Sequence, residues 1–224
     1  MSQNIVIAGV GGQGTILASR LIAQAAINEN KQVRSAETIG MAQRGGSVLG
    51  HVRVFDANDA HPPMSPLIGP SQADLLMAFE PAEAARNLHL LKAGGCLISA
   101  DKAIMPVHAQ LAKDISQVYD VNRVLLWLNE HSNPDRPDSF QVYLVDGQTI
   151  LDSLGSSKVL NVVLLGVALS VAALGVQETS LLAALQALVP ARLLDLNLQA
   201  LAEGKVYGTK HERPTMVADN QAVS

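Results

Sequence analysis

The sequence has 224 residues, of which 48% are hydrophobic, so it is long enough to bury the core of one large α/β domain. Charged residues make up only 16% of the chain, against about 25% in a typical globular protein. A net charge of −4 without a long basic run argues against nucleic-acid binding.

The chain opens with an apolar run, residues 4–8, that leads directly into glycines. This pattern predicts a buried parallel strand, a tight turn and a helix over 15–27, because three of the glycines have the G-x-G-x-x-G spacing. N–H groups at such a helix start attract anions. The first four residues lack the features of a signal peptide, so we expect a cytoplasmic protein.

This turn provides the first candidate site, although a purely structural role stays open for its glycines. Gln13 favours contact with a ligand or partner, because its amide supplies both a donor and an acceptor that a simple turn does not need. The candidate residues are Gly9, Gly11, Gly12, Gln13 and Gly14.

A bound dinucleotide would also require an acidic residue about 20 residues further on, at the end of the second strand. The second strand is predicted over 32–36, and Glu37 has roughly the right position. However, Glu37 opens a segment, residues 37–47, that does not resemble a usual strand-to-helix connection. This segment lowers the support for a dinucleotide site.

The same segment provides the second candidate site, formed by Gln43, Arg44, Gly45 and Gly46. Two glycines permit close backbone approach, so the neighbouring guanidinium is well placed to bind a carboxylate, a phosphate or an acidic partner surface. A solvated loop charge is the alternative interpretation of Arg44.

Further strands and helices alternate along the next hundred residues. Alternation over 47–55 predicts a half-exposed strand, in which we interpret His51 as a packing residue. A central strand over 73–79 precedes a helix over 82–92, which begins at Glu80-Pro81 and ends at Gly94-Gly95. Later strands are predicted over 96–100, 103–107, 121–128 and 141–145, with a helix over 108–118 and a polar loop over 129–138.

Two features near the strand over 96–100 receive no catalytic role. Cys96 is the only cysteine, which excludes a disulfide or a cluster held by this chain alone, and we interpret it as a buried structural thiol. Asp101 and Lys102 follow the strand end, where ligands of α/β folds gather, but strand ends are often simply charged. The scattered histidines predict no metal site.

The last part of the chain is expected to be helical. Residues 159–176 contain no charge over 18 residues, but glycine and polar interruptions favour a buried helix over a membrane span. Because such a helix needs cover, the isolated chain is expected to form a homo-oligomer. Amphipathic helices follow over 178–188 and 190–202. The predicted domain covers residues 1–204, and residues 205–224 form a polar tail.

Four features of the sequence, taken together, resemble one protein family. They are the glycine turn, the Q-R-G-G-S-V segment over 43–48, the apolar helix near Asn161 and the chain end around Asn197, Ala200 and Gly204. This combination is similar to the gamma-type subunits of 2-oxoacid:ferredoxin oxidoreductases, especially those of indolepyruvate enzymes. The resemblance implies a three-layer, Rossmann-like α/β domain with a mostly parallel sheet and a helical C-terminal part.

The resemblance further implies a subunit of an enzyme that oxidatively decarboxylates a 2-oxoacid, forms an acyl-CoA and passes electrons to ferredoxin. Thiamine diphosphate and iron–sulfur clusters are then expected on a larger partner subunit, with no cofactor bound by this chain and coenzyme A as a co-substrate. No catalytic residue can be assigned. Two alternatives stay open: a free-standing NAD-dependent Rossmann oxidoreductase, and a non-catalytic scaffolding subunit.

Overall fold

The computed structural model describes residues 2–40, 46–102, 120–171 and 173–210. Within these residues, strands form one mixed sheet in the order β2-β3-β1-β4-β5-β6. Strands β1, β4, β5 and β6 are parallel, whereas β3 runs antiparallel to both of its neighbours. The strands are β1 (Gln3–Val10), β2 (Gln32–Ile39), β3 (Ser47–Phe55), β4 (Ala73–Ala78), β5 (Leu91–Ala100) and β6 (Gln141–Val145).

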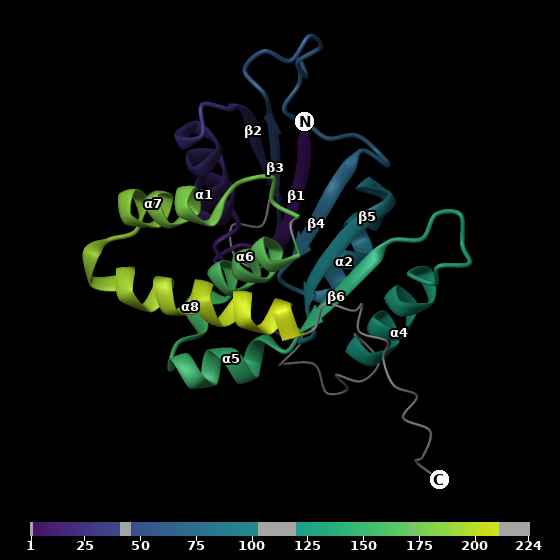
Figure 1. The fold of residues 1–224 in the computed structure, drawn as a ribbon. Helices are drawn as coiled ribbons and strands as arrows, with labels where there is room; N and C mark the ends of the chain where they lie inside the picture. Colours follow the sequence, from purple (N-terminus) through teal and green to yellow (C-terminus); the bar gives the residue numbers. More distant parts are fainter. Residues whose placement is uncertain (1, 41–45, 103–119, 172, 211–224) are drawn as a thin grey trace.

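Helices cover both faces of this sheet (Figure 1). In β1, Ile5 and Ile7 join the apolar core under one helical layer, and the alternating Val6 and Ala8 join a second core under the other. The first layer contains α1 (Thr15–Asn28), α5 (Gly147–Leu154), α6 (Leu160–Ser170), α7 (Glu178–Leu188) and α8 (Ala191–Lys210), and the second contains α2 (Pro81–Asn87) and α4 (Val121–His131). The predicted three-layer α/β fold is therefore confirmed.

Strand β3 differs from its prediction as a half-exposed strand, because most of its residues are buried. It lies between β2 and β1, so hydrogen-bonded strands flank both of its edges. Gly50 packs against Ser19 of α1, and His51, on the opposite face, accepts a hydrogen bond from Ile68 of the following loop. The edge strand is instead β2, which extends to Ile39 and is largely exposed. The β1-α1-β2 unit therefore does not place its two strands side by side.

Two predictions in the middle of the chain are wrong. The helix that begins at Pro81 ends at Asn87, and after a single 3₁₀ turn the chain is already in β5 at Leu91. Residues 121–128 form helix α4 rather than a strand. Asp120 caps this helix by accepting hydrogen bonds from the N–H groups of Asn122 and Arg123, at 3.0 and 3.3 Å.

The uncharged stretch forms a shorter helix than predicted, α6, which begins after a 3₁₀ turn (Ser157–Val159) and ends at Ser170. Its residues 160–168 are all buried within the chain, so the expected need for a second chain to cover it is not supported. No helix in the described residues has the length and apolar character required to cross a membrane.

Helix α8 continues to Lys210, six residues beyond the predicted domain boundary at 204. Tyr207 explains part of this extension, because its hydroxyl donates a hydrogen bond to the Leu144 carbonyl at 3.1 Å. The predicted strand over 103–107, the predicted helix over 108–118 and the tail over 211–224 lie outside the described residues.

Candidate functional site

The two candidate segments of the sequence meet at one edge of the sheet, where β1, β4, β5 and β6 end. We call it the carboxyl edge. The pairing of Val10 with Ser47 brings the glycine turn beside the start of β3. There the Gly11 N–H donates a hydrogen bond to the Gly46 carbonyl at 2.9 Å. The carboxyl ends of parallel strands are where ligands of α/β folds usually bind.

Only part of the second candidate segment can be placed. Gly46 lies at the carboxyl edge, whereas Gln43, Arg44 and Gly45 lie outside the described residues. The Gly40 N–H also donates a hydrogen bond to the Ser47 carbonyl at 2.9 Å. Both ends of the connection between β2 and β3 are therefore fixed at this edge.

The side chain of Gln13 links the glycine turn to the start of α2. Its Oε1 accepts a hydrogen bond from the Val10 N–H at 2.8 Å, and its Nε2 donates to Glu80 Oε1 at 2.6 Å. Glu80 is only 5% exposed, so this hydrogen bond lies away from bulk water. The amide that suggested a ligand contact thus has a structural use, and direct contact with a ligand stays a prediction.

Three glycines of the turn have structural reasons to be glycine. A Cβ on Gly9 would lie 2.7 Å from the Phe79 ring and 2.8 Å from Gln13 Oε1. Gly12 has a φ of 99°, a conformation that other residues rarely adopt. Gly14 packs against Asn161 of α6, whose Nδ2 donates to the Gly14 carbonyl at 3.3 Å. Gly14 therefore packs the start of α1 against α6.

Glu83, in the first turn of α2, holds the start of β3. Glu83 is 2% exposed, and its Oε2 accepts a hydrogen bond from Ser47 Oγ at 2.7 Å. Its Oε1 pairs with the guanidinium of Arg86, one turn further along the helix. Sequence reasoning missed both Glu80 and Glu83, because acidic residues at a helix start are usually explained by the helix dipole.

A further group of polar residues lies where β5 and β6 end. Burial, and secondarily the nearby Asp146 carboxylate, raise the pKa of Asp101 above its ordinary value. In contrast, hydrogen bonds from Thr149 lower the pKa of Asp146, whose carboxylate also pairs with Lys102 at 3.6 Å. Tyr207 accepts a hydrogen bond from the Asp146 N–H at 3.2 Å. The carboxyl edge is therefore rich in carboxylates.

Two residues without an expected catalytic role pack inside the domain, His51 fully buried and Cys96 half-buried. His51 is 4% exposed, and its Nδ1 accepts a hydrogen bond from the Ile68 N–H at 3.2 Å. Burial and the neighbouring Arg53 lower its pKa, so the ring is neutral at pH 7. Burial also raises the pKa of the Cys96 thiol to about 12, which makes it a poor nucleophile. The packing interpretation of His51 is therefore confirmed, whereas Cys96, expected to be buried, is only partly buried against the core.

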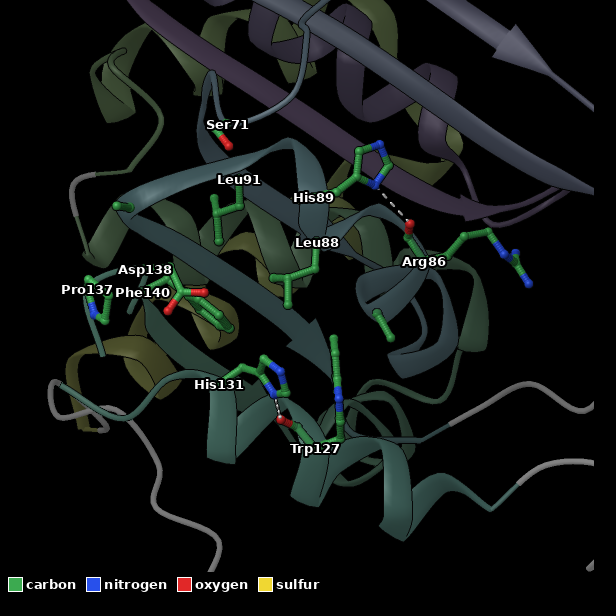
Figure 2. A pocket seen from close by; sticks show the side chains of 12 residues that line it. Ser71, Arg86, Leu88, His89, Leu91, Trp127, His131, Pro137, Asp138 and Phe140 are labelled. Atoms are coloured by element: carbon green, nitrogen blue, oxygen red, sulfur yellow. Dashed lines mark hydrogen bonds between the residues drawn. The ribbon is translucent and has the colours of Figure 1, made fainter. Parts of the chain in front are cut away.

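A hollow of about 590 Å³ lies elsewhere, between the end of α2 and helix α4 (Figure 2). Leu88 and Leu91 line one side, and the rings of Trp127 and His131 pack together on the other with centroids 4.0 Å apart. The His131 Nδ1–H donates to the Trp127 carbonyl at 2.8 Å. None of the candidate residues from the sequence lines this hollow.

The geometry disfavours a dinucleotide at the glycine turn. Glu37 lies on the edge strand β2, and β3 separates it from β1. A ribose held by an acidic residue requires that residue on the strand beside β1. In the part of the chain that the structure describes, no group of three His, Cys, Asp or Glu residues could hold a metal ion.

Comparison with known proteins extends these observations. The model of the family described as pyruvate ferredoxin/flavodoxin oxidoreductase matches residues 4–207. The indolepyruvate oxidoreductase subunit IorB of Archaeoglobus fulgidus is 35% identical over 206 residues, which are 91% of this chain and 94% of the relative. The subunit of the same name from Methanothermobacter thermautotrophicus is 31% identical over 204 residues, which are 91% and 96% of the two chains.

Solved structures show the same fold at lower identity. The gamma subunit of a keto/oxoacid ferredoxin oxidoreductase from Geobacter sulfurreducens is 23% identical, with a TM-score of 0.66 over 93% of this chain and 99% of that chain. A 2-oxoglutarate:ferredoxin oxidoreductase from Magnetococcus marinus is 19% identical, with a TM-score of 0.65 over 100% of this chain and 33% of that chain.

The fold and its carboxyl edge thus define a three-layer α/β domain of the kind seen in oxoacid ferredoxin oxidoreductase gamma subunits. With a match over nearly its whole length, the chain belongs to the pyruvate ferredoxin/flavodoxin oxidoreductase family. The family resemblance identified from the sequence is confirmed.

Proposed function

We propose that this chain is the small subunit of a thiamine-diphosphate-dependent 2-oxoacid:ferredoxin oxidoreductase that acts on indolepyruvate or another arylpyruvate. In the proposed reaction the 2-oxoacid loses CO₂, its acyl group forms a thioester with coenzyme A, and an electron pair passes to ferredoxin. The observation that carries the proposal is the similarity to subunits named for indolepyruvate oxidoreductase, which extends over at least 91% of each chain compared.

The residues of this chain do not fit the family's redox cofactors. Cys96 is its single cysteine, whereas an iron–sulfur cluster needs several thiolates. We therefore assign the clusters and thiamine diphosphate to a larger partner subunit. This chain would contribute binding and orientation at the interface with that partner.

The carboxyl edge is the part of the chain best suited to that role. It brings the glycine turn and the Gly46 end of the second segment together at 2.9 Å. Arg44 is two residues from Gly46 in the sequence. We propose that Arg44 contacts an acidic surface of the partner or a phosphate of coenzyme A.

The main test is reconstitution with the larger subunit, followed by 2-oxoacid-dependent dye reduction. We expect activity only when both subunits are present, and kcat/KM for indolepyruvate about tenfold or more above that for pyruvate or 2-oxoglutarate. A chain that never co-purifies with a thiamine diphosphate subunit would contradict the proposal. Saturable micromolar NAD binding in calorimetry would instead support the dehydrogenase alternative.

The role of Arg44 can be tested in the same assay. Arg44→Ala should leave the melting temperature unchanged and reduce activity at least about tenfold, because it removes a charge-assisted contact at an interface. Arg44→Lys should restore activity only in part, since lysine lacks the planar fork of donors. Arg192→Ala, at an exposed position of α8, is the matched control and should have little effect. Equal losses in both Ala variants would argue against a specific role.

A further inference from the structure

The start of helix α2 contacts both segments that form the carboxyl edge. Glu80, immediately before the helix, accepts the hydrogen bond from Gln13 at 2.6 Å. Glu83, in the first turn, accepts the hydrogen bond from Ser47 at 2.7 Å. One helix start thereby fixes two loops that are more than thirty residues apart in the sequence.

Both carboxylates are withdrawn from solvent, at 5% and 2% exposure for Glu80 and Glu83. Burial of a carboxylate is unfavourable unless donors compensate for its lost hydration, so these hydrogen bonds are strongly constrained in geometry. Pro81 at the first helical turn restricts the backbone between them. The spacing of the two acceptors is thus set by a short and rigid element.

The hydrogen bond between the two loops lies directly beyond Val10 and Ser47, the last paired residues of the β1–β3 ladder. Gly11 and Gly46 are joined by a single backbone hydrogen bond of 2.9 Å. Gln13 lies two residues after Gly11, and Ser47 directly follows Gly46. A shift of either side chain away from its glutamate would therefore move one partner of this hydrogen bond.

We propose that Glu80 and Glu83 are positioning residues, which hold the glycine turn and the start of β3 in the arrangement that the larger subunit binds. They act through Gln13 and Ser47. The part of this inference that concerns the partner rests on the proposed function, whereas the part that concerns the arrangement of the two loops does not.

Amide hydrogen exchange in the full chain alone tests the arrangement directly. Glu80→Ala and Ser47→Ala should each speed exchange of the Gly11 amide about tenfold, since each removes one hydrogen bond that holds the loops. Amides of α6 and α8 should keep their protection. Unchanged exchange at Gly11, or an equal increase across α6 and α8, would overturn the proposal.

Conservative variants separate positioning from general destabilisation. Glu80→Gln keeps an oxygen that can accept from Gln13, so it should restore slow exchange at Gly11. Ser132→Ala is the matched control, because it also removes one serine hydrogen bond, of 2.8 Å to the Asn129 carbonyl, from a half-buried site on another helix. If Ser132→Ala speeds Gly11 exchange as much as Ser47→Ala does, the proposed network is not specific.

Titration with the larger subunit tests the consequence for assembly. Glu80→Ala and Ser47→Ala should raise the apparent Kd for that subunit about tenfold and leave kcat at saturation unchanged, whereas Glu80→Gln should behave like the wild type. An unchanged Kd would overturn the assembly role. If the wild-type complex proves inactive, the proposed function fails, but the exchange result at Gly11 still decides whether the two glutamates position the loops.

Discussion

The carboxyl edge and the pair of helices α6 and α8 use glycine in different ways. At the carboxyl edge, glycines accommodate a tight turn, and buried carboxylates hold the loops through side-chain hydrogen bonds. Between α6 and α8, Gly166 and Gly204 let the two helix backbones touch, and apolar side chains surround the contact. Only the first region is assembled from hydrogen bonds that can be broken one at a time.

This difference predicts how each region responds to substitution. Close-packed apolar contacts transmit a change in volume to the whole core, so changes between α6 and α8 should reduce global stability. Changes at the carboxyl edge should act locally and affect assembly first. The following predictions test this contrast.

The largest expected effect follows Gly204→Ala. A Cβ at this position would overlap the carbonyl oxygen of Val163, and neither backbone can move aside without separating the helices. We expect a loss of about 3 kcal/mol in the free energy of unfolding, which is the upper end of the usual cost of overpacking a protein core. Chemical denaturation of the isolated chain measures it.

Gly208→Ala is the matched control for this prediction, on the same helix. There the added Cβ would meet the Ser170 hydroxyl, which can rotate away, and would lie 3.1 Å from Ser170 Cβ and 3.2 Å from the Val167 carbonyl oxygen, contacts that small shifts relieve. Alanine also favours the helix by about 1 kcal/mol over glycine, so this variant should cost much less than Gly204→Ala. Equal destabilisation by both variants would show that direct backbone contact does not govern this helix pair.

An intermediate effect is expected for Gln13→Glu. It places a second carboxylate against Glu80, where Gln13 now donates at 2.6 Å. Two adjacent carboxylates raise the pKa of one of them, so stability is retained at low pH and lost as the pH rises through that pKa. We expect a loss of about 2 kcal/mol at pH 8 and much less at pH 5.

The control for the added charge is Gln24→Glu in α1, the helix that follows the glycine turn. Gln24 also donates a hydrogen bond, of 2.9 Å, but its acceptor is the exposed and uncharged side chain of Asn28. Gln24→Glu should change the free energy of unfolding by no more than about 0.5 kcal/mol between pH 5 and 8. A pH-dependent loss as large as that of Gln13→Glu would mean that net charge, and not the contact with Glu80, is responsible.

The contrast also explains what the sequence could predict. The glycine turn and the paired Q-R-G-G-S-V segment were recognisable because their signals lie within a few neighbouring residues. Their contact through Gly11 and Gly46 was not predictable, since it depends on the insertion of β3 beside β1, a pairing between distant segments. The roles of Glu80 and Glu83 depend on the same pairing.

Local signals were also misinterpreted. Residues 121–128 contain enough valine and leucine to suggest a strand, yet Asp120 is a helix cap and Val124 and Leu128 have helical spacing. The cap was the signal that could have identified α4. The buried pairing of helices α6 and α8 depends on Gly166 in one helix and Gly204 in the other, so no single segment reveals it.

The smallest expected effect concerns Asp101, at the carboxyl edge but outside the network of α2. Burial and the neighbouring Asp146 raise its pKa in the folded chain, so folding favours the protonated form. The stability from this group is fully present below its unfolded pKa, near 4, and is lost as the pH rises through the folded pKa. Asp101→Asn should therefore raise the melting temperature slightly at pH 7 and have no such benefit below pH 4.

Asp138→Asn is the control, because its effect on the melting temperature should have the opposite sign. The hydrogen bonds from Arg136 lower the pKa of Asp138, so any stability it contributes is present above its unfolded pKa and is lost as the pH falls. This exposed pair contributes little, so the variant should change the melting temperature slightly downward or not at all at pH 7. If both asparagine variants raise the melting temperature equally at pH 7, the gain comes from reduced net negative charge. A gain confined to Asp101→Asn would instead show that the crowding of carboxylates at the carboxyl edge lowers stability, as expected of a surface arranged for binding a partner.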